Sequence, residues 1–434
     1  MVRAAGRIVT AMTNTTTTTT TDALERFPLE PLAAPTANAI TELTTSAPWR
    51  PELSEATLEG FRARAGELDR ANVYFDDDLG ELRDVGYLAA AVPSERGGWG
   101  LDLAQLARSQ RRLARYAPAT ALSMSMHSYW VGIANELERL GDDSLRWIQE
   151  AAAAGEVFAA GHAEAGNDIP VLLSTCRAER VPGGYRLTGR KQFGSNGPAW
   201  SWLGAHAIDT DASDGPQIVH AFVERSSPGV TVVETWDTLG MRPTQSHDTV
   251  LDGVFVPDAR IGRVVAAGDG SDPFLVAMAI WPLALIAAAY LGIAERTLEL
   301  AVESARNKTS MAIERGALAY NPMVQHQVAE MYLELDAANA TFERFVDEWV
   351  AGVDHGEGWV PRVYAMKWRS VEAAKRVVDT ALDVAGGAAM FRGSELERLY
   401  RDARCGGFHP GNDALTHELV GKSVLGILAE QPRW

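Results

Sequence analysis

Cysteine is scarce in this sequence, with only Cys176 and Cys405 among 434 residues. Because the two lie far apart in the chain, they exclude both a disulfide framework and a cysteine-rich zinc site. We therefore expect a protein of a reducing compartment, the cytoplasm, and predict no metal site.

Positive charge is also in short supply. The 57 acidic residues outnumber the 40 lysines and arginines and leave a formal net charge of −17. Wholesale binding to nucleic acid or to an anionic membrane needs a basic face, so this balance argues against both kinds of partner. A local basic pocket is still compatible with it.

Long hydrophobic runs are limited to one clear case. The most apolar stretch, 274–293, is about long enough to span a bilayer. Trp281 and Pro282 interrupt this stretch, however, and the charged residues Glu295 and Arg296 follow it directly. We expect a buried core helix here in place of a membrane span.

The N-terminal segment has no apolar pattern. It includes seven consecutive threonines at 15–21, a low-complexity run with nothing to pack against a core. It also lacks the continuous apolar stretch of a secretory signal. We predict a disordered tail over 1–30, with either Met1 or Met12 as the start.

The rest of the chain is predicted to be an α+β protein in three parts. A helical pattern runs over 40–155, with Ser54 and Asp102 as candidate N-caps. Alternating and β-branched runs, separated by turn residues, dominate 156–270. Long amphipathic stretches return over 271–434. This order predicts a β domain between two helical domains.

Three segments carry a family resemblance. The segment 187–200 reads LTGRKQFGSNGPAW, 239–246 reads LGMRPTQS, and 400–404 reads YRDAR. In this order and spacing they resemble two flavin-contacting elements and the closing motif of the acyl-CoA dehydrogenases. The resemblance implies the fold of that family: an N-terminal helical domain, a middle β-barrel domain and a C-terminal four-helix bundle.

The resemblance also implies a flavin, FAD with FMN as the alternative. Phe193 would cover the isoalloxazine ring, and Ser195 would place its hydroxyl near flavin N5. Such residues suit a flat ring that needs an apolar cover and a few directed polar groups. The other residues at matching positions are Gly161, His162, Asn196, Arg242, Gly386 and Gly387.

Two departures from the family pattern remove contacts that the family makes with the adenosine half of the flavin. Gly386 and Gly387 resemble the turn that holds a neighbouring subunit's flavin pyrophosphate, but Asp383 occupies the position of the family's glutamine. The family's adenine contact, R-x-x-F-G, is missing after Arg306. We therefore expect a flavin that exchanges. Because the family completes its flavin site across a subunit boundary, we also expect a homotetramer or at least a dimer.

The catalytic base of the family is replaced. Its closing turn has Tyr-Glu where this sequence has His409 and Pro410, and a second known base position reads Pro282. A prolyl ring cannot accept a proton, so an α,β-desaturation has no obvious base. Glu418 is the nearest spare carboxylate, but its spacing from Lys422 is typical of a surface ion pair.

At these departing positions the sequence is more similar to a side branch with the same fold. This branch is the two-component flavin monooxygenases, such as dibenzothiophene monooxygenase and the 4-hydroxyphenylacetate hydroxylase oxygenase. Members take reduced flavin from a separate flavin reductase and react it with oxygen. The resemblance implies catalytic roles for Ser195, His127 and His409, since a neutral imidazole can hold a proton near physiological pH. Taken alone, His127 on its apolar helix is also compatible with a core histidine whose ring nitrogens are satisfied.

We predict a flavin-dependent oxidoreductase, with monooxygenation or oxidation of a small, mostly apolar substrate preferred. Two alternatives stay open. One is a dehydrogenase of acyl-CoA or acyl-carrier-protein thioesters with a displaced base. The other is a non-catalytic scaffold that binds an acyl chain or a partner.

Overall fold

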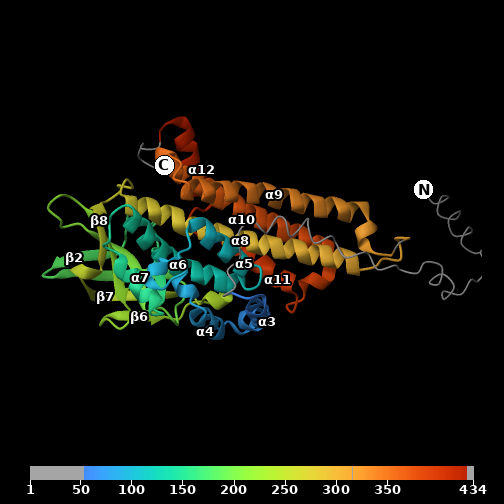
Figure 1. Ribbon diagram of the computed structural model, residues 1–434, viewed down its shortest axis with the longest axis horizontal. Coiled ribbons are helices and arrows are strands. Elements are labelled where there is room, and N and C mark those ends of the chain that lie inside the picture. The colour runs from blue at the N-terminus through green and yellow to red at the C-terminus, as the bar shows by residue number, and fades with distance from the viewer. Residues whose placement is uncertain (1–52, 315, 428–434) are drawn as a thin grey trace, which may run out of the picture.

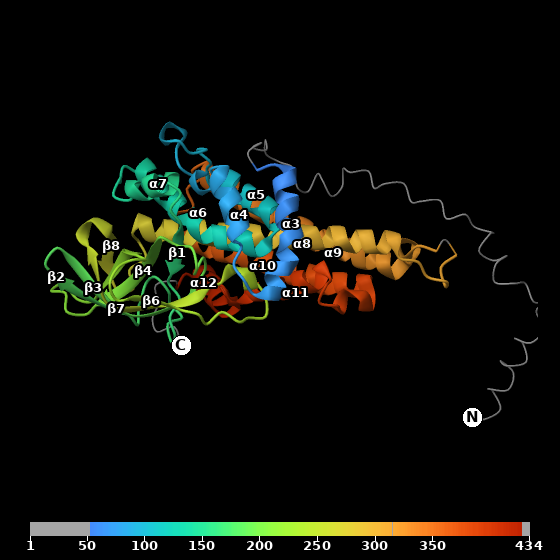
Figure 2. The ribbon, with the colours of Figure 1, turned by 90° about the horizontal axis from the view of Figure 1, so that it is seen from below.

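The computed structural model describes residues 53–314 and 316–427 (Figure 1). The expected tail over 1–30 lies outside these residues. In the described part, a β-sheet occupies one end of the molecule and long helices extend away from it (Figures 1 and 2). The predicted α+β organisation is confirmed.

The N-terminal part is helical, and its helix starts carry capping side chains. Ser54 accepts a hydrogen bond from the Thr57 amide, and Asp102 forms a capping box with Gln105. Both predicted caps are confirmed. The helices are α3 (Glu55–Ala71), α4 (Asp76–Asp84), α5 (Leu103–Ala114), α6 (Pro118–Arg139) and α7 (Arg146–Ala153).

The described strands form one mixed, eight-stranded sheet. Its order is β6-β7-β3-β2-β4-β5-β8, and β1 pairs with β4 in parallel. Because this path ends at β6 and β8, the barrel implied by the family resemblance is an open sheet in the described residues. The strands are β1 (Phe158–Gly161), β2 (Arg177–Val181), β3 (Gly184–Gly194), β4 (Trp202–Asp209), β5 (Gln217–Glu224), β6 (Val230–Val233), β7 (His247–Pro257) and β8 (Ile261–Ala266).

The C-terminal part is a bundle built on α8 (Pro273–Asn307). Among the described helices, α8 alone is long and apolar enough to cross a membrane, and 83% of its most apolar window is buried. The predicted core helix is therefore confirmed, with Pro282 inside it. Around α8 pack α9 (Pro322–Val350), α10 (Trp359–Ala385) and α11 (Glu395–Cys405), while α12 (Asp413–Leu425) packs on α10.

The three parts of the chain meet beside the end of α3. The Asp69 carboxylate of α3 accepts two hydrogen bonds from Arg401 of α11, at 3.0 and 2.6 Å. Arg242, in the loop before β7, donates to the Asp69 carbonyl at 2.9 Å. In the same loop, the Met241 amide donates to the Asp402 carboxylate of α11 at 2.6 Å. These contacts fasten a loop of the β domain to both helical parts.

Candidate functional site

Left-handed backbone outside glycine is concentrated at one junction in the β domain, with Val171 apart from it. Left-handed φ angles are uncommon outside glycine and often lie at functional sites. Phe193 and Asn196 have φ of 56° and 66°, and Met241 and Gln245 have φ of 53° and 42°. The two segments are joined by a hydrogen bond of 3.1 Å from the Asn196 amide to the Thr244 carbonyl. This junction between the end of β3 and the loop before β7 is the candidate site.

Three hydroxyl groups form a chain across the junction, which we call the hydroxyl chain (Ser195, Ser246 and Thr244). Thr244 donates to the Met241 carbonyl at 2.8 Å. The Ser246 hydroxyl lies 2.7 Å from that of Thr244 and 2.8 Å from that of Ser195. Each hydroxyl has one proton, so Ser246 must donate to Thr244 and Ser195 to Ser246. The Oγ atom of Ser195 therefore keeps its lone pairs for an outside donor.

Asn196, which the resemblance assigns to cofactor binding, uses its side chain to join parts of the protein. Its side-chain oxygen accepts from the Tyr74 hydroxyl at 2.9 Å, and its side-chain nitrogen donates to the Ser123 carbonyl at 3.0 Å. The residue is fully buried. Both ends of the side chain are thus used to hold β3 against α6 and the segment that follows α3.

Phe193 lies next to this anchored segment and faces outward. Its side chain is 59% exposed, and Trp236 stands edge-on to it with 6.0 Å between ring centroids. Together they form an apolar platform beside the hydroxyl chain. Arg242 binds protein groups instead, since it donates to the Asp69 carbonyl at 2.9 Å and to Asp237 at 3.0 Å. In this structure Arg242 anchors the loop to α3.

The second part of the site is the turn after α11. The Nε2 atom of His409 lies 2.7 Å from the Tyr290 hydroxyl of α8. Lys367 of α10 is buried and donates to the carbonyls of Gly406 and Gly411, at 3.0 and 3.2 Å. Burial and the Lys367 ammonium lower the pKa of His409 to about 3, and burial lowers the pKa of Lys367 to about 7. His409 is therefore a neutral imidazole in a tethered turn at physiological pH.

Helix α11 connects the two parts of the site. Its Asp402 binds the Met241 amide, where the hydroxyl chain ends, and its C-terminus leads into the turn that carries His409. Among the described residues, the hydrogen bond of His409 goes to Tyr290 and not to the hydroxyl chain. The two parts are thus linked through a helix and share no direct hydrogen bond.

His127, for which the resemblance implies a catalytic role, has both ring nitrogens bonded to backbone groups. Its Nε2 lies 2.7 Å from the Leu88 carbonyl, and its Nδ1 accepts from the Phe158 amide at 3.2 Å. A carbonyl only accepts and an amide only donates, so Nε2 carries the proton and the ring is neutral. Burial lowers its pKa to about 4. With both nitrogens bound to backbone, none is left for a substrate.

Gly161 and His162 pack among residues of the β domain and of α6, whose Trp130 ring centroid lies 5.6 Å from that of His162. A side chain added at Gly161 would meet Leu203 of β4 at 3.1 Å, so close strand packing accounts for this glycine. His162 stacks on His206 with 5.3 Å between ring centroids, and His206 stacks on His220 at 5.9 Å. Burial lowers the pKa of His162 well below its usual value. Neither residue has a hydrogen bond to the hydroxyl chain in the described structure.

Gly386 and Gly387 lie at the far end of the bundle. Lys308, just after α8, donates to the Ala385 carbonyl at the end of α10. The 35 residues of α8 span about 50 Å, and the helix begins after β8, on the side of the sheet. Both glycines are exposed. A single chain therefore does not bring them to the hydroxyl chain.

The positions expected for a base hold no ionisable side chain. Pro410 lies in the turn after α11, and Pro282 lies inside α8. Glu418 pairs with Lys422 at 3.1 Å, with side chains 16% and 17% exposed. The ion pair predicted from their spacing is therefore confirmed.

Five members of the site are not singled out by the sequence pattern. Thr244 and Ser246 belong to the 239–246 motif, so the hydroxyl side chains of that motif could have identified them as site residues. Tyr290 and Lys367 lie within long helices and differ in no pattern from their neighbours, because tertiary packing alone gives them their partners. The fifth member is Trp236.

Family comparison matches all three parts of the chain. The N-terminal domain of the acyl-CoA dehydrogenases matches residues 50–153, the middle domain 158–254 and the C-terminal domain 284–425. The matches follow the order helices, sheet and helices seen in the structure.

Individual relatives span nearly the same length. The protein YdbM of Bacillus subtilis (strain 168), assigned to the acyl-CoA dehydrogenases, is 29% identical over 367 residues, which cover 84% of this chain and 93% of YdbM. L-evernosamine nitrososynthase of a Micromonospora species is 27% identical over 369 residues, which cover 82% of this chain and 85% of the relative.

Solved structures agree with these matches. The structure of KijD3 in complex with dTDP superposes with a TM-score of 0.76 at 26% identity, covering 92% of this chain and 100% of KijD3. A second KijD3 structure contains FMN and a dTDP-linked amino sugar. Because all three domains match in order, this chain belongs to the acyl-CoA dehydrogenase superfamily.

Proposed function

We propose that this protein uses reduced flavin and oxygen to oxidise or monooxygenate a small, mostly apolar substrate. The observation that carries the proposal is the turn after α11. A neutral histidine, bonded to Tyr290 and tethered by Lys367, stands next to Pro410, which takes the place of the carboxylate that a desaturating relative needs. With a pKa of about 3, His409 is a poor base for removing a proton from carbon. Its neutral ring suits hydrogen bonding to an oxygen-derived group.

The residues at the junction fit a flavin. The exposed ring of Phe193, braced by Trp236, offers the apolar cover that an isoalloxazine needs. The Ser195 Oγ atom offers a hydrogen-bond acceptor beside it. A bound flavin would supply the electrons that activate oxygen. We propose FAD, with FMN as the alternative, delivered by a separate flavin reductase because the contacts expected for the adenosine half are incomplete.

A second subunit belongs to this proposal. Gly386 and Gly387 are exposed at the far end of the bundle, so they can contact a flavin only in another copy of the chain. We propose a homotetramer, or at least a dimer, in a reducing cytoplasm. Sedimentation of the purified protein measures the assembly directly, and a folded monomer at micromolar concentration would contradict it.

The test of the proposed function starts from protein mixed with reduced FMN or FAD without oxygen. On addition of oxygen, we expect oxygen consumption that depends on the reduced flavin. A saturated acyl-CoA should not support reduction of an electron-accepting dye. Steady dye reduction that is lost in Glu418→Gln would instead assign a dehydrogenase with a displaced base. Failure to bind flavin in either redox state would favour the scaffold.

The direction of the hydroxyl chain predicts a preference for reduced flavin. The N5 atom of a reduced flavin carries a proton, which Ser195 can accept, whereas oxidised N5 needs a donor. Replacing Ser246 by alanine removes the acceptor of the Ser195 proton and frees it to donate. We expect the ratio of affinities for reduced and oxidised flavin to fall about tenfold, as for one hydrogen bond of about 1.4 kcal/mol.

Anaerobic fluorescence titration measures both affinities without turnover. Ser144→Ala, at an exposed serine after α6, is the matched control and should leave the ratio unchanged. An unchanged ratio in Ser246→Ala, in a protein that still binds flavin, would contradict the assigned direction of the chain.

A further inference from the structure

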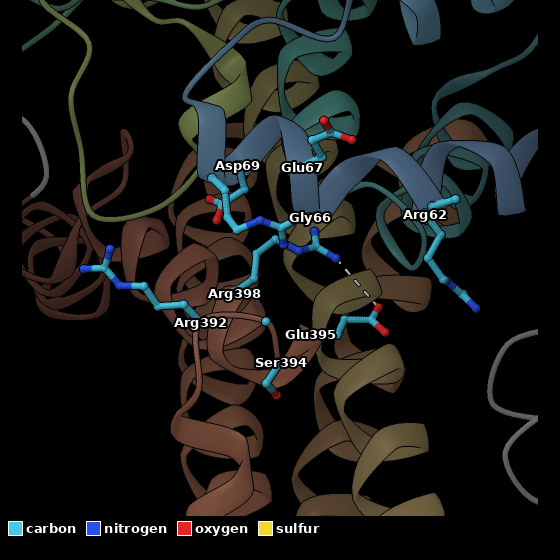
Figure 3. A pocket seen from close by; sticks show the side chains of 11 residues that line it. Arg62, Gly66, Glu67, Asp69, Arg392, Ser394, Glu395 and Arg398 are labelled. Carbon is cyan, nitrogen blue, oxygen red and sulfur yellow. Dashed lines mark ion pairs between the residues drawn. The ribbon is translucent and has the colours of Figure 1, made fainter.

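We propose that a cavity between α3 and the loop joining α10 to α11 binds a phosphate group. The cavity has a volume of about 180 Å³ and lies beside the buried Arg398 (Figure 3). We call it the arginine pocket. Its lining residues are Arg62, Ala63, Gly66, Glu67, Asp69, Arg70, Arg392, Gly393, Ser394, Glu395 and Arg398. It shares no residue with the hydroxyl chain or with the His409 turn, and the proposal does not depend on flavin.

Arg398 is the central observation. Its side chain is 8% exposed, and its ion-pair partner, Glu395, is 3.8 Å away, beyond hydrogen-bonding distance. Among the described residues, no acceptor is within hydrogen-bonding distance of its guanidinium. No nitrogen of this guanidinium is completely sealed from the cavity, and with no acceptor among the described residues its N–H donors are free to bind an anionic ligand. Figure 3 shows Arg398 extending from α11 toward Gly66 of α3.

The start of α11 points to the same kind of ligand. Ser394 is the N-cap of this 11-residue helix, and its side chain makes no capping hydrogen bond. Free amide groups and the helix dipole at such an end favour an anion. A side chain added at the preceding Gly393 would meet nothing within 4 Å, so the approach is open.

The carboxylates in the wall are largely neutralised from outside the pocket. Asp69 accepts two hydrogen bonds from Arg401, at 3.0 and 2.6 Å. Glu395 accepts two from Arg296, at 3.1 and 2.9 Å. Neither of these two arginines lines the pocket. Glu67, which is exposed, is the remaining acidic group of the lining.

The positive charge of the arginines that line the pocket exceeds the negative charge of Glu67. Arg62 is already engaged, since it pairs with Glu59 at 3.1 Å. Arg70 and Arg392 are exposed at the rim and have no ion pair with a described residue, and Figure 3 shows Arg392 extending outward. Together with Arg398 they leave a net positive site in a chain of strongly negative charge.

A phosphate suits this arrangement better than a carboxylate. Its several oxygens and double charge can accept from a planar guanidinium and from helix amides together. The same chemistry is offered by free phosphate and by the phosphate of a nucleotide, because the pocket is open at the Gly393 side. Inorganic phosphate and AMP therefore distinguish the two sources.

The experiment titrates the full-length, flavin-free protein with inorganic phosphate and, separately, with AMP. Calorimetry at constant chloride concentration gives the affinities. Arg398→Gln should weaken phosphate binding about tenfold or more, as expected for loss of charge-assisted hydrogen bonds. Arg376→Gln, at an exposed arginine of α10 paired with Glu334, is the matched control and should change nothing.

A second variant tests the proposal independently if Arg398→Gln does not fold. Replacing both Arg70 and Arg392 by glutamine alters exposed side chains, keeps the fold and should weaken phosphate binding several-fold. Equal affinity in the wild type and in this double variant, or no binding of phosphate and AMP at millimolar concentration, would overturn the proposal. Binding of AMP alone would assign the pocket to a nucleotide phosphate. Since flavin is absent, these outcomes are separate from those of the proposed oxygen chemistry.

Discussion

Replacing His409 by alanine is expected to separate oxygen consumption from substrate oxygenation. The imidazole is bonded to Tyr290 at 2.7 Å, and alanine leaves a gap with no hydrogen-bonding group in its place. Oxygen should still be consumed with reduced flavin, but hydrogen peroxide should replace most of the oxygenated product. Loss of a hydrogen bond of about 1.5 kcal/mol corresponds to a change of about tenfold in this partition.

The ratio of product to hydrogen peroxide measures this partition. Tyr290→Phe keeps the imidazole and should have a smaller effect, whereas His326→Ala, at an exposed histidine of α9, should have none. Because the pKa of His409 is about 3, its ring stays neutral over roughly pH 5 to 9, and the defect should not vary across that range. An unchanged product yield in His409→Ala would remove this residue from the proposed chemistry.

Replacing His127 by alanine is expected to destabilise the folded protein. The change leaves the buried Leu88 carbonyl and the Phe158 amide without the partners that the ring supplied. Each unsatisfied buried group costs about 1–3 kcal/mol, and the space left by the ring adds to that cost. We expect a loss of about 3–5 kcal/mol in the free energy of unfolding, measured by denaturant titration. His326→Ala is again the control.

The same histidine predicts sensitivity to acid. Burial lowers the pKa of His127 from 6.5 to about 4, so between these values the unfolded chain binds more protons than the native one. Stability from this group is complete above about pH 6.5 and is lost as the pH falls toward 4, by about 3 kcal/mol. His127→Gln, which does not titrate, should reduce the slope of stability against pH by up to one proton. An identical slope in wild type and variant would contradict the assignment.

The sequence by itself determined the features that depend on near neighbours in the chain. Ser54 and Asp102 cap their helices because their partners lie three residues away. The Glu418–Lys422 pair follows from helical spacing. The apolar run at 274–293 could be predicted as a core helix because its composition alone favours burial. The family motifs likewise predict Phe193 and Ser195 as site residues.

Tertiary structure alone decided the roles that depend on distant segments. The resemblance implies a catalytic role for His127 and its apolar helix is also compatible with a core role, whereas only the fold brings the Leu88 carbonyl and the Phe158 amide to its two ring nitrogens. The fold likewise bonds the Asn196 side chain to Tyr74, and it sets the direction of the Ser195 hydrogen bond through Ser246.

Arg398 illustrates the same limit. The sequence pattern does not distinguish Arg398 from the other arginines of α11, whereas packing against α3 buries it without a hydrogen-bond partner in the described residues. The physical reason is that a hydrogen bond or an ion pair depends on distances of a few ångströms between atoms. For residues far apart in the chain, only the packing of the whole fold sets those distances.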